Sequence, residues 1–271
     1  MKKNTTLVLI TIIIVISIVI SYKKGYMDRD QSKLMKNVDM LDTQKDTSIV
    51  IHPELEYFPN TKGYLVSPEK KGDYPGIVII HENRGLRPEI KDTAEQLAKE
   101  GYVVLAVDLY KGQVAETQAQ AREISPSFDQ KTGIENMRAA VDYLRRSGAK
   151  KIASLGWCFG GKQSVELSIS GEKLDATVVY YGGGMATTKD KLMPIMWPVM
   201  GVFGGADQSI PESMVREFKT SLNDIGVENE IYIYPGVAHA FANPSGMNYA
   251  PSETKDAWNK TINFLNNHLK K

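Results

Sequence analysis

The chain has 271 residues, of which 42% are hydrophobic and 24% are charged. These are ordinary globular proportions, so they exclude a disordered, collagen-like or disulfide-built protein. The net charge of +1 gives no general electrostatic reason to bind nucleic acid. A single cysteine excludes an intramolecular disulfide, and with four scattered histidines it offers no ligand cluster for a structural metal.

An uncharged segment lies near the amino terminus, between Lys3 and Lys23. As a helix it would span about 28 Å, close to the hydrocarbon thickness of a bilayer. No small-x-small cleavage pattern follows, which favours an uncleaved signal anchor over residues 1–22, with a cleaved signal peptide as the alternative. A polar stalk over residues 23–48 and one domain over residues 49–271 complete the expected organisation.

The membrane topology is harder to predict, because lysines flank the apolar run on both sides. The short amino tail and the signal-like layout favour a domain outside the cytoplasm. We therefore expect a membrane-anchored protein, with secretion as the alternative.

Beyond the stalk, apolar runs typical of buried strands alternate with amphipathic helical patterns. The expected strands are 61–67, 76–80, 102–107, 151–155, 176–181, 198–203 and 230–234, and the expected helices are 89–100, 134–146, 163–169, 211–225 and 252–269. This alternation predicts an α/β fold with a mostly parallel central sheet and helices on both faces. In such sheets, functional residues gather just beyond the carboxyl ends of the strands.

The strongest local signal is the run Gly-Trp-Cys-Phe-Gly-Gly at 156–161, between an expected strand and an expected helix. It fits a nucleophile elbow with Cys158 in the serine position. A strained turn of this kind brings backbones together and leaves no room for a β-carbon, which explains the glycines. We expect the helix N-terminus to lower the pKa of the thiol and to favour an oxyanion. The alternative is a structural cysteine in a glycine-rich turn.

Two later residues support the first interpretation. Asp207 directly follows the strand at 198–203, and His239 follows the strand at 230–234. Alone, the aspartate would be a helix cap and the histidine a surface or core residue. The chain order nucleophile, acid, histidine is nevertheless the order of an α/β-hydrolase triad.

The loop at 81–86, which follows the strand at 76–80, sits where this fold donates the second oxyanion-hole N–H. With it, the chain resembles the dienelactone hydrolase family of α/β-hydrolases. The matching pieces are HENRGL, VDLY, GWCFGG, FGGADQSIP and YPGVAHAF, in the correct order. The resemblance implies a triad of Cys158, His239 and Asp207, with Glu82 contacting the cysteine and helping to form the thiolate. It also implies an oxyanion hole formed by the backbone N–H groups of Phe159 and Asn83.

The chain departs from the lactonase pattern at Asn243, where enzymes acting on dienelactone carry an arginine for the substrate carboxylate. A second substrate arginine would fall in a segment where only Arg122 fits. An asparagine cannot replace a permanently charged, bidentate group, so dienelactone itself is in doubt as a substrate. Further candidates for substrate contact are Arg84 and the aromatic residues Tyr110, Trp157, Trp197 and Phe241, each of which could equally be a core residue.

The sequence therefore predicts a hydrolase that cleaves a small ester or lactone through a thioester intermediate, without a metal or organic cofactor. Glu82 or His239 would take the thiol proton. A thioesterase uses the same constellation and is the first alternative. A non-catalytic binding module that kept the fold is the second. The oligomeric state is not predicted.

The N-terminal segment gives a prediction about the location of the protein. The full-length chain should sediment with membranes after cell breakage, whereas a fragment that starts near Ser48 should be soluble and active, because the stalk carries no catalytic motif. A full-length chain that keeps its N-terminus and stays in the supernatant would contradict the anchor.

Overall fold

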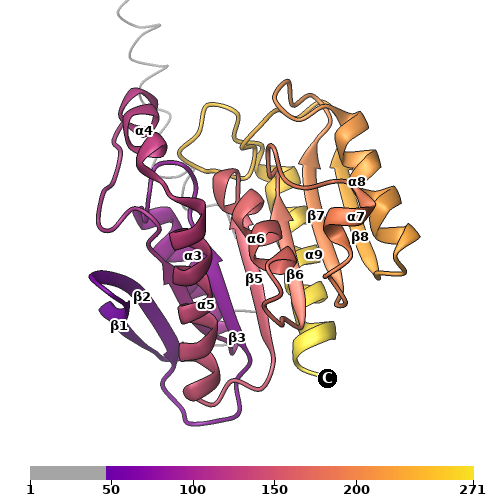
Figure 1. Cartoon of the computed structure of the whole chain (residues 1–271). Coiled ribbons are helices and arrows are strands. Elements are labelled where there is room, and N and C mark those ends of the chain that lie inside the picture. The colour runs from indigo at the N-terminus through magenta and orange to yellow at the C-terminus, as the bar shows by residue number, and fades with distance from the viewer. Residues whose placement is uncertain (1–46) are drawn as a thin grey trace, which may run out of the picture. The chain divides into compact units, whose positions relative to one another are not determined.

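Eight strands form one sheet in the part of the chain that the computed structural model describes, residues 47–271 (Figure 1). They are β1 (Ile49–Phe58), β2 (Thr61–Pro68), β3 (Gly76–Ile80), β4 (Val103–Val107), β5 (Ile152–Trp157), β6 (Ala176–Tyr180), β7 (Val199–Gly204) and β8 (Asn229–Tyr234). The order across the sheet is β1-β2-β4-β3-β5-β6-β7-β8. β1 pairs antiparallel with β2, and β2 with β4, whereas all neighbours from β4 to β8 are parallel. The mostly parallel sheet is thus confirmed.

Helices cover both faces of this sheet, as expected. The helices are α3 (Pro88–Lys99), α4 (Gln118–Ile124), α5 (Gln130–Arg146), α6 (Phe159–Ile169), α7 (Lys189–Leu192), α8 (Glu212–Asp224) and α9 (Pro251–Leu269). On β6, Thr177 hydrogen-bonds Ser168 of α6, while Tyr180 hydrogen-bonds Thr261 of α9. Residues three apart in a strand point to opposite faces, so α6 and α9 lie on opposite sides of the sheet (Figure 1).

The central strands are almost wholly apolar because both of their faces are covered. Every residue of β3, β5, β6 and β7 is buried. Ile80 at the end of β3 pairs with Val107 on one side and with Gly156 on the other. The loops that follow β3, β4 and β5 therefore leave the sheet at the same edge.

Several elements differ from the sequence-based expectation. β1 is a strand that we did not expect, since it is largely exposed and contains Pro53, which only an edge strand tolerates. α5 begins at Gln130, four residues before the expected start, because the Asp129 carboxylate accepts the Thr132 N–H and caps the helix. α4 was also not expected, although Thr117 and Gln120 form a capping box at its start.

The predicted anchor at residues 1–22 and almost all of the predicted stalk lie outside the described residues. Within residues 47–271, no helix combines the length and the hydropathy that a membrane crossing requires.

The glycines around the turn between β5 and α6 give a prediction about stability. A β-carbon on Gly156 would stand 2.1 Å from the Gly160 carbonyl oxygen, and one on Gly160 would stand 2.1 Å from that of Ile80. We expect Gly156→Ala or Gly160→Ala to lower the free energy of unfolding by about 3 kcal/mol or more, because only backbone could move aside. Gly183→Ala is the control, since its nearest neighbour would be an Ile210 side-chain atom at 3.7 Å. Denaturant unfolding of the three variants tests this prediction, and an equal loss of unfolding free energy in all three would contradict it.

Candidate active site

Cys158 occupies the turn between the last residue of β5 and the first residue of α6. Its backbone has φ 53° and ψ −113°, a left-handed conformation that favours glycine. Two backbone hydrogen bonds hold the turn: the Cys158 N–H donates to Tyr180 O at 3.0 Å, and the Lys162 N–H donates to Cys158 O at 3.1 Å. The strained turn places the half-buried side chain at the carboxyl edge of the sheet, as the elbow motif requires.

The structure brings Cys158, His239 and Asp207 together in one hydrogen-bonded chain. His239 Nε2 lies 3.1 Å from Cys158 Sγ, and His239 Nδ1 lies 2.6 Å from Asp207 Oδ2. A carboxylate on Nδ1 fixes the tautomer with the proton on that nitrogen. The lone pair of Nε2 then faces the thiol, so the imidazole can accept its proton.

Asp207 holds the histidine and the local turn at the same time. Its Oδ1 accepts the N–H of Ser209 at 2.8 Å and that of Ile210 at 3.2 Å, while Oδ2 accepts from His239. The side chain is only 1% exposed. The alternative helix-cap role of Asp207 is wrong, because these two N–H groups precede α8, whose N-cap is Pro211 and has no side-chain cap. One carboxylate oxygen closes the local turn and the other holds His239.

The electrostatic environment of the thiol differs from our expectation. Burial, followed by the negative charge of Glu82, raises the pKa of Cys158 to about 12, and the charge of Asp207 adds to this. The N–H of Phe159, at the start of α6, opposes the rise only in part. The helix terminus acts in the expected direction, but desolvation outweighs it, so the expected lowering of the thiol pKa is wrong. The thiol thus needs a base, and His239 is the group in contact.

Of the two residues of the implied oxyanion hole, Phe159 adjoins the thiol, and Asn83 lies in the loop after β3. Phe159 is the first residue of α6, and its N–H points at the Cys158 sulfur. Asn83 lies in the loop between β3 and α3, and its side-chain amide donates to Gln118 of α4 at 3.2 Å. This bond ties the loop to α4, the second helix that follows it along the chain.

Glu82 is held by Asn243 and makes no hydrogen bond to the thiol. Asn243 Nδ2 donates to Glu82 Oε2 at 2.5 Å, and Glu82 Oε1 is buried without a hydrogen-bond partner among the described residues. Both are among the predicted site residues, and the structure places them in contact. Glu82 is close enough for its charge to act on Cys158, and the contact that the resemblance implied stays a prediction, without a hydrogen bond between the two.

Neither arginine proposed for substrate contact meets the triad. Arg84 Nε donates to Ala115 O at 3.1 Å, and its Nη2 donates to Glu116 O, so the guanidinium ties two loops together. Arg122 is exposed on α4. Their predicted roles toward substrate find no support in these contacts.

Of the proposed aromatic pocket, only Tyr110 packs beside the candidate oxyanion hole. Its ring lies 5.4 Å from that of Phe159. Trp157 packs on Tyr180, and Phe241 is fully buried, so both belong to the core. Trp197 precedes β7 and donates to Thr177, at the opposite end of the sheet from the triad, so its proposed place in the pocket is wrong.

A residue that the sequence did not single out packs directly on the catalytic candidate His239. Tyr181 is fully buried, has φ 36°, and its ring lies 5.3 Å from the imidazole in an edge-on arrangement. The sequence marks this position only by the glycine run that follows it. A β-carbon on Gly182 would stand 2.9 Å from the Gly161 backbone, so the chain after Tyr181 packs closely against the start of α6.

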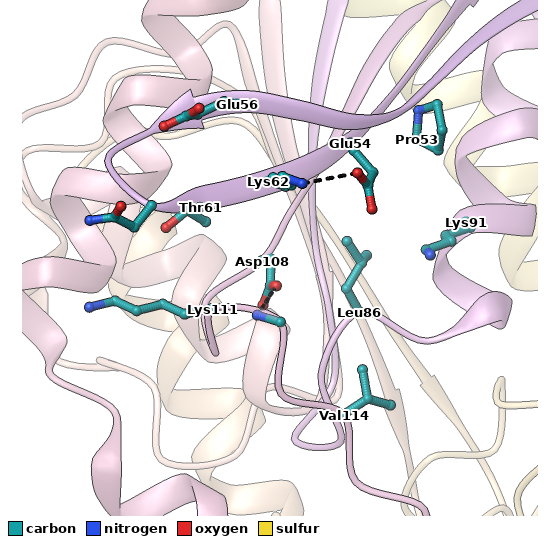
Figure 2. A pocket seen from close by; sticks show the side chains of 12 residues that line it. Pro53, Glu54, Glu56, Thr61, Lys62, Leu86, Lys91, Asp108, Lys111 and Val114 are labelled. Carbon is teal, nitrogen blue, oxygen red and sulfur yellow. Dashed lines mark hydrogen bonds and ion pairs between the residues drawn. The ribbon is translucent and has the colours of Figure 1, made fainter.

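Two cavities adjoin the loops at this edge of the sheet. One, of about 560 Å³, lies between the β1–β2 hairpin and the loops after β3 and β4. It carries both signs of charge, and Glu54 of β1 is paired with Lys62 of β2 on the hairpin wall (Figure 2). The other, of about 270 Å³, is lined by Tyr110 and Phe128. Cys158 lines neither. Within residues 47–271, no group of three or more His, Cys, Asp or Glu side chains could hold a metal ion.

Comparison with known proteins gives a consistent result. The model of the dienelactone hydrolase family matches residues 61–269. The "Protein usf" of Aquifex pyrophilus is 30% identical over 219 residues, which cover 77% of this chain and 94% of that protein. A Yersinia pestis protein named "Putative carboxymethylenebutenolidase" is 27% identical over 222 residues, covering 76% of this chain and 83% of its own length.

Solved structures agree on the fold. A dienelactone hydrolase-like promiscuous phosphotriesterase, P91, from metagenomic libraries superposes with a TM-score of 0.74 at 22% identity, over 82% of this chain and 99% of its own. A dienelactone hydrolase-type structure from Klebsiella pneumoniae gives a TM-score of 0.69 at 23% identity, over 80% and 98%. The expected α/β-hydrolase-like fold is therefore confirmed.

The strained backbone at the elbow gives a prediction. Cys158→Gly should be more stable than Cys158→Ala by about 1 kcal/mol, because glycine adopts a positive φ without strain. In an ordinary strand or helix, the alanine variant would be the more stable of the two. Thermal or denaturant unfolding of the two variants checks the order, and a more stable alanine variant would mean that the turn is not strained.

Proposed function

Because this chain belongs to the dienelactone hydrolase family, we propose that it hydrolyses small carboxylic esters or lactones through a thioester on Cys158. The observation that carries the proposal is the hydrogen-bonded chain from Cys158 through His239 to Asp207. A thiol, an imidazole and a buried carboxylate in this order are the parts of a nucleophilic acyl-transfer site.

In the acylation step, His239 Nε2 accepts the thiol proton as the Cys158 sulfur forms a bond to the substrate carbonyl carbon. The carbonyl π electrons move to oxygen, where the N–H groups of Phe159 and Asn83 would stabilise the oxyanion. The tetrahedral intermediate collapses by breaking the carbon–oxygen bond to the leaving group. The departing alkoxide takes the proton from His239, and the acyl group stays on sulfur.

Deacylation uses the same residues in the same roles. His239, which Asp207 holds in one tautomer, accepts a proton from a water molecule that attacks the thioester carbonyl. Breaking the carbon–sulfur bond returns the electron pair to sulfur, and the proton on His239 restores the thiol. The product is a carboxylic acid, and for a lactone the released hydroxyl stays on the same molecule.

The contacts of the polar residues favour neutral substrates. The residue at the place of the family's substrate arginine is Asn243, which is bonded to Glu82, and the Arg84 guanidinium is bonded to backbone carbonyls. A substrate carboxylate would therefore meet no free guanidinium from these two positions.

The location of the protein, on a membrane anchor or secreted, is part of the proposal and depends on residues 1–22 alone.

The proposed triad gives a prediction for hydrolysis. Cys158→Ala should lower kcat/KM for an activated aryl ester by about a thousandfold or more, and Cys158→Ala combined with His239→Ala should be hardly worse, because triad residues act as a unit. The wild type should release a stoichiometric burst of product. A panel of aryl esters, lactones and thioesters identifies the preferred acyl donor. Full turnover by a pure, folded Cys158→Ala preparation would rule out the cysteine nucleophile.

A further inference from the structure

Glu82 is a buried carboxyl group with an incomplete set of partners. Oε2 accepts one hydrogen bond, from Asn243, and Oε1 is buried with none from the described residues. An ionised carboxylate has room for about four hydrogen bonds, and leaving it unpaired away from water is energetically unfavourable. The geometry therefore disfavours the charged form.

The partner of Glu82 is an uncharged amide whose orientation the structure fixes. Asn243 Oδ1 accepts the backbone N–H of Ser245 at 2.9 Å. The oxygen end of the amide is thus occupied, and the NH₂ end must face Glu82. This contact supplies one neutral donor and no positive charge.

The charged and titratable groups around Glu82 do not supply the missing charge. They are Arg84 on its own loop, Glu89 on α3, Cys158 at the elbow, Tyr181 after β6 and His239 after β8. The Arg84 guanidinium is committed to Ala115 and Glu116, and His239 donates to Asp207. Glu89 and a Cys158 thiolate would both repel a negative charge on Glu82.

These contacts agree with the direction of the titration. Burial raises the pKa of Glu82 above the usual glutamate value, and the Asn243 hydrogen bond and the charge on His239 offset this only in part. A negative Glu82 also raises the pKa of Cys158. The thiolate and the ionised Glu82 thus oppose each other.

We propose that Glu82 carries a proton in the substrate-free protein and that Asn243 is a positioning residue, which holds this neutral carboxyl group beside Cys158. The carbonyl oxygen of the acid is Oε2, which accepts from Asn243, and the proton is on Oε1. His239 then takes the thiol proton, and the thiolate forms next to an uncharged group. Ionisation of Glu82 at higher pH places a second negative charge beside the sulfur and suppresses the thiolate.

The competing assignment makes Glu82 a carboxylate that accepts the thiol proton itself. The two assignments differ by one proton in the substrate-free protein and make opposite predictions for Glu82→Gln. Glutamine imitates the neutral acid, whereas it cannot serve as a base. The inference rests on the proposed nucleophile Cys158, but the protonation of Glu82 can be measured without any substrate.

The first experiment records carboxyl infrared bands of the full-length protein at neutral pH. The difference between wild type and Glu82→Gln should show the carbonyl stretch of a protonated acid. The difference between wild type and Asp129→Asn is the control and should show carboxylate bands, because the hydrogen bonds from Thr132 hold the pKa of the Asp129 carboxyl below its usual range. Asn243→Arg should convert the Glu82 band to a carboxylate, because a guanidinium stabilises the charged form. A carboxylate band for Glu82 in the wild type would overturn the proposal.

The second experiment follows the alkylation of Cys158 by iodoacetamide, a neutral reagent, across pH. Below the titration of Glu82, wild type and Glu82→Gln should react at similar rates. Above it, Glu82→Gln should react faster by on the order of tenfold, because the variant never acquires the repelling charge. The Cys158→Ala variant, which has no cysteine, gives the background rate of alkylation.

A slower Glu82→Gln at every pH would identify Glu82 as the base and overturn the inference. If Glu82→Gln fails to fold, the Asn243→Arg variant and the wild-type infrared titration still decide the question. Loss of labelling in all proteins, with a protonated Glu82 in the infrared, would instead count against the proposed function.

Discussion

The close approach of three backbone segments beneath Cys158 is the constraint on which the rest of the site depends. The start of α6 lies so near the end of β3 that a β-carbon on Gly160 would stand 2.1 Å from Ile80 O, and the end of β6 limits Gly161 in the same way, at 2.5 Å from Tyr180 O. Only glycine permits this packing. It leaves Cys158 in a left-handed conformation, which turns the thiol out of the sheet and sets the N–H of Phe159 against it.

The sheet then brings the other two catalytic candidates to the thiol. β6, β7 and β8 run parallel to β5, so the loops that follow them open at one edge. Asp207 uses one oxygen to close its own turn and the other to orient His239, and its burial keeps water away from both bonds. The orientation of the imidazole therefore depends on Asp207, which the fold brings from the loop after β7, and not only on the loop that carries His239.

Burial has opposite consequences for the two acidic groups beside the imidazole. It strengthens the interaction between Asp207 and His239, because the carboxylate has hydrogen-bond donors on both oxygens. For Glu82, with one neutral donor and an unpaired oxygen, it favours the protonated form. It also raises the pKa of the thiol, which makes nucleophile formation depend on proton transfer to His239. Whether a buried acid is charged is thus decided by its donors.

The sequence by itself determined the parallel strands, the elbow at Cys158 and the order of Asp207 and His239, because strand periodicity, helix ends and turn glycines are local properties of the chain. It missed β1, whose exposed edge position removes the apolar alternation. It also could not determine the bond between Asn243 and Glu82, the packing of Tyr181 on His239, or the raised pKa of the thiol. These depend on desolvation and on contacts between segments up to 161 residues apart in the chain, and only the packed tertiary structure sets both.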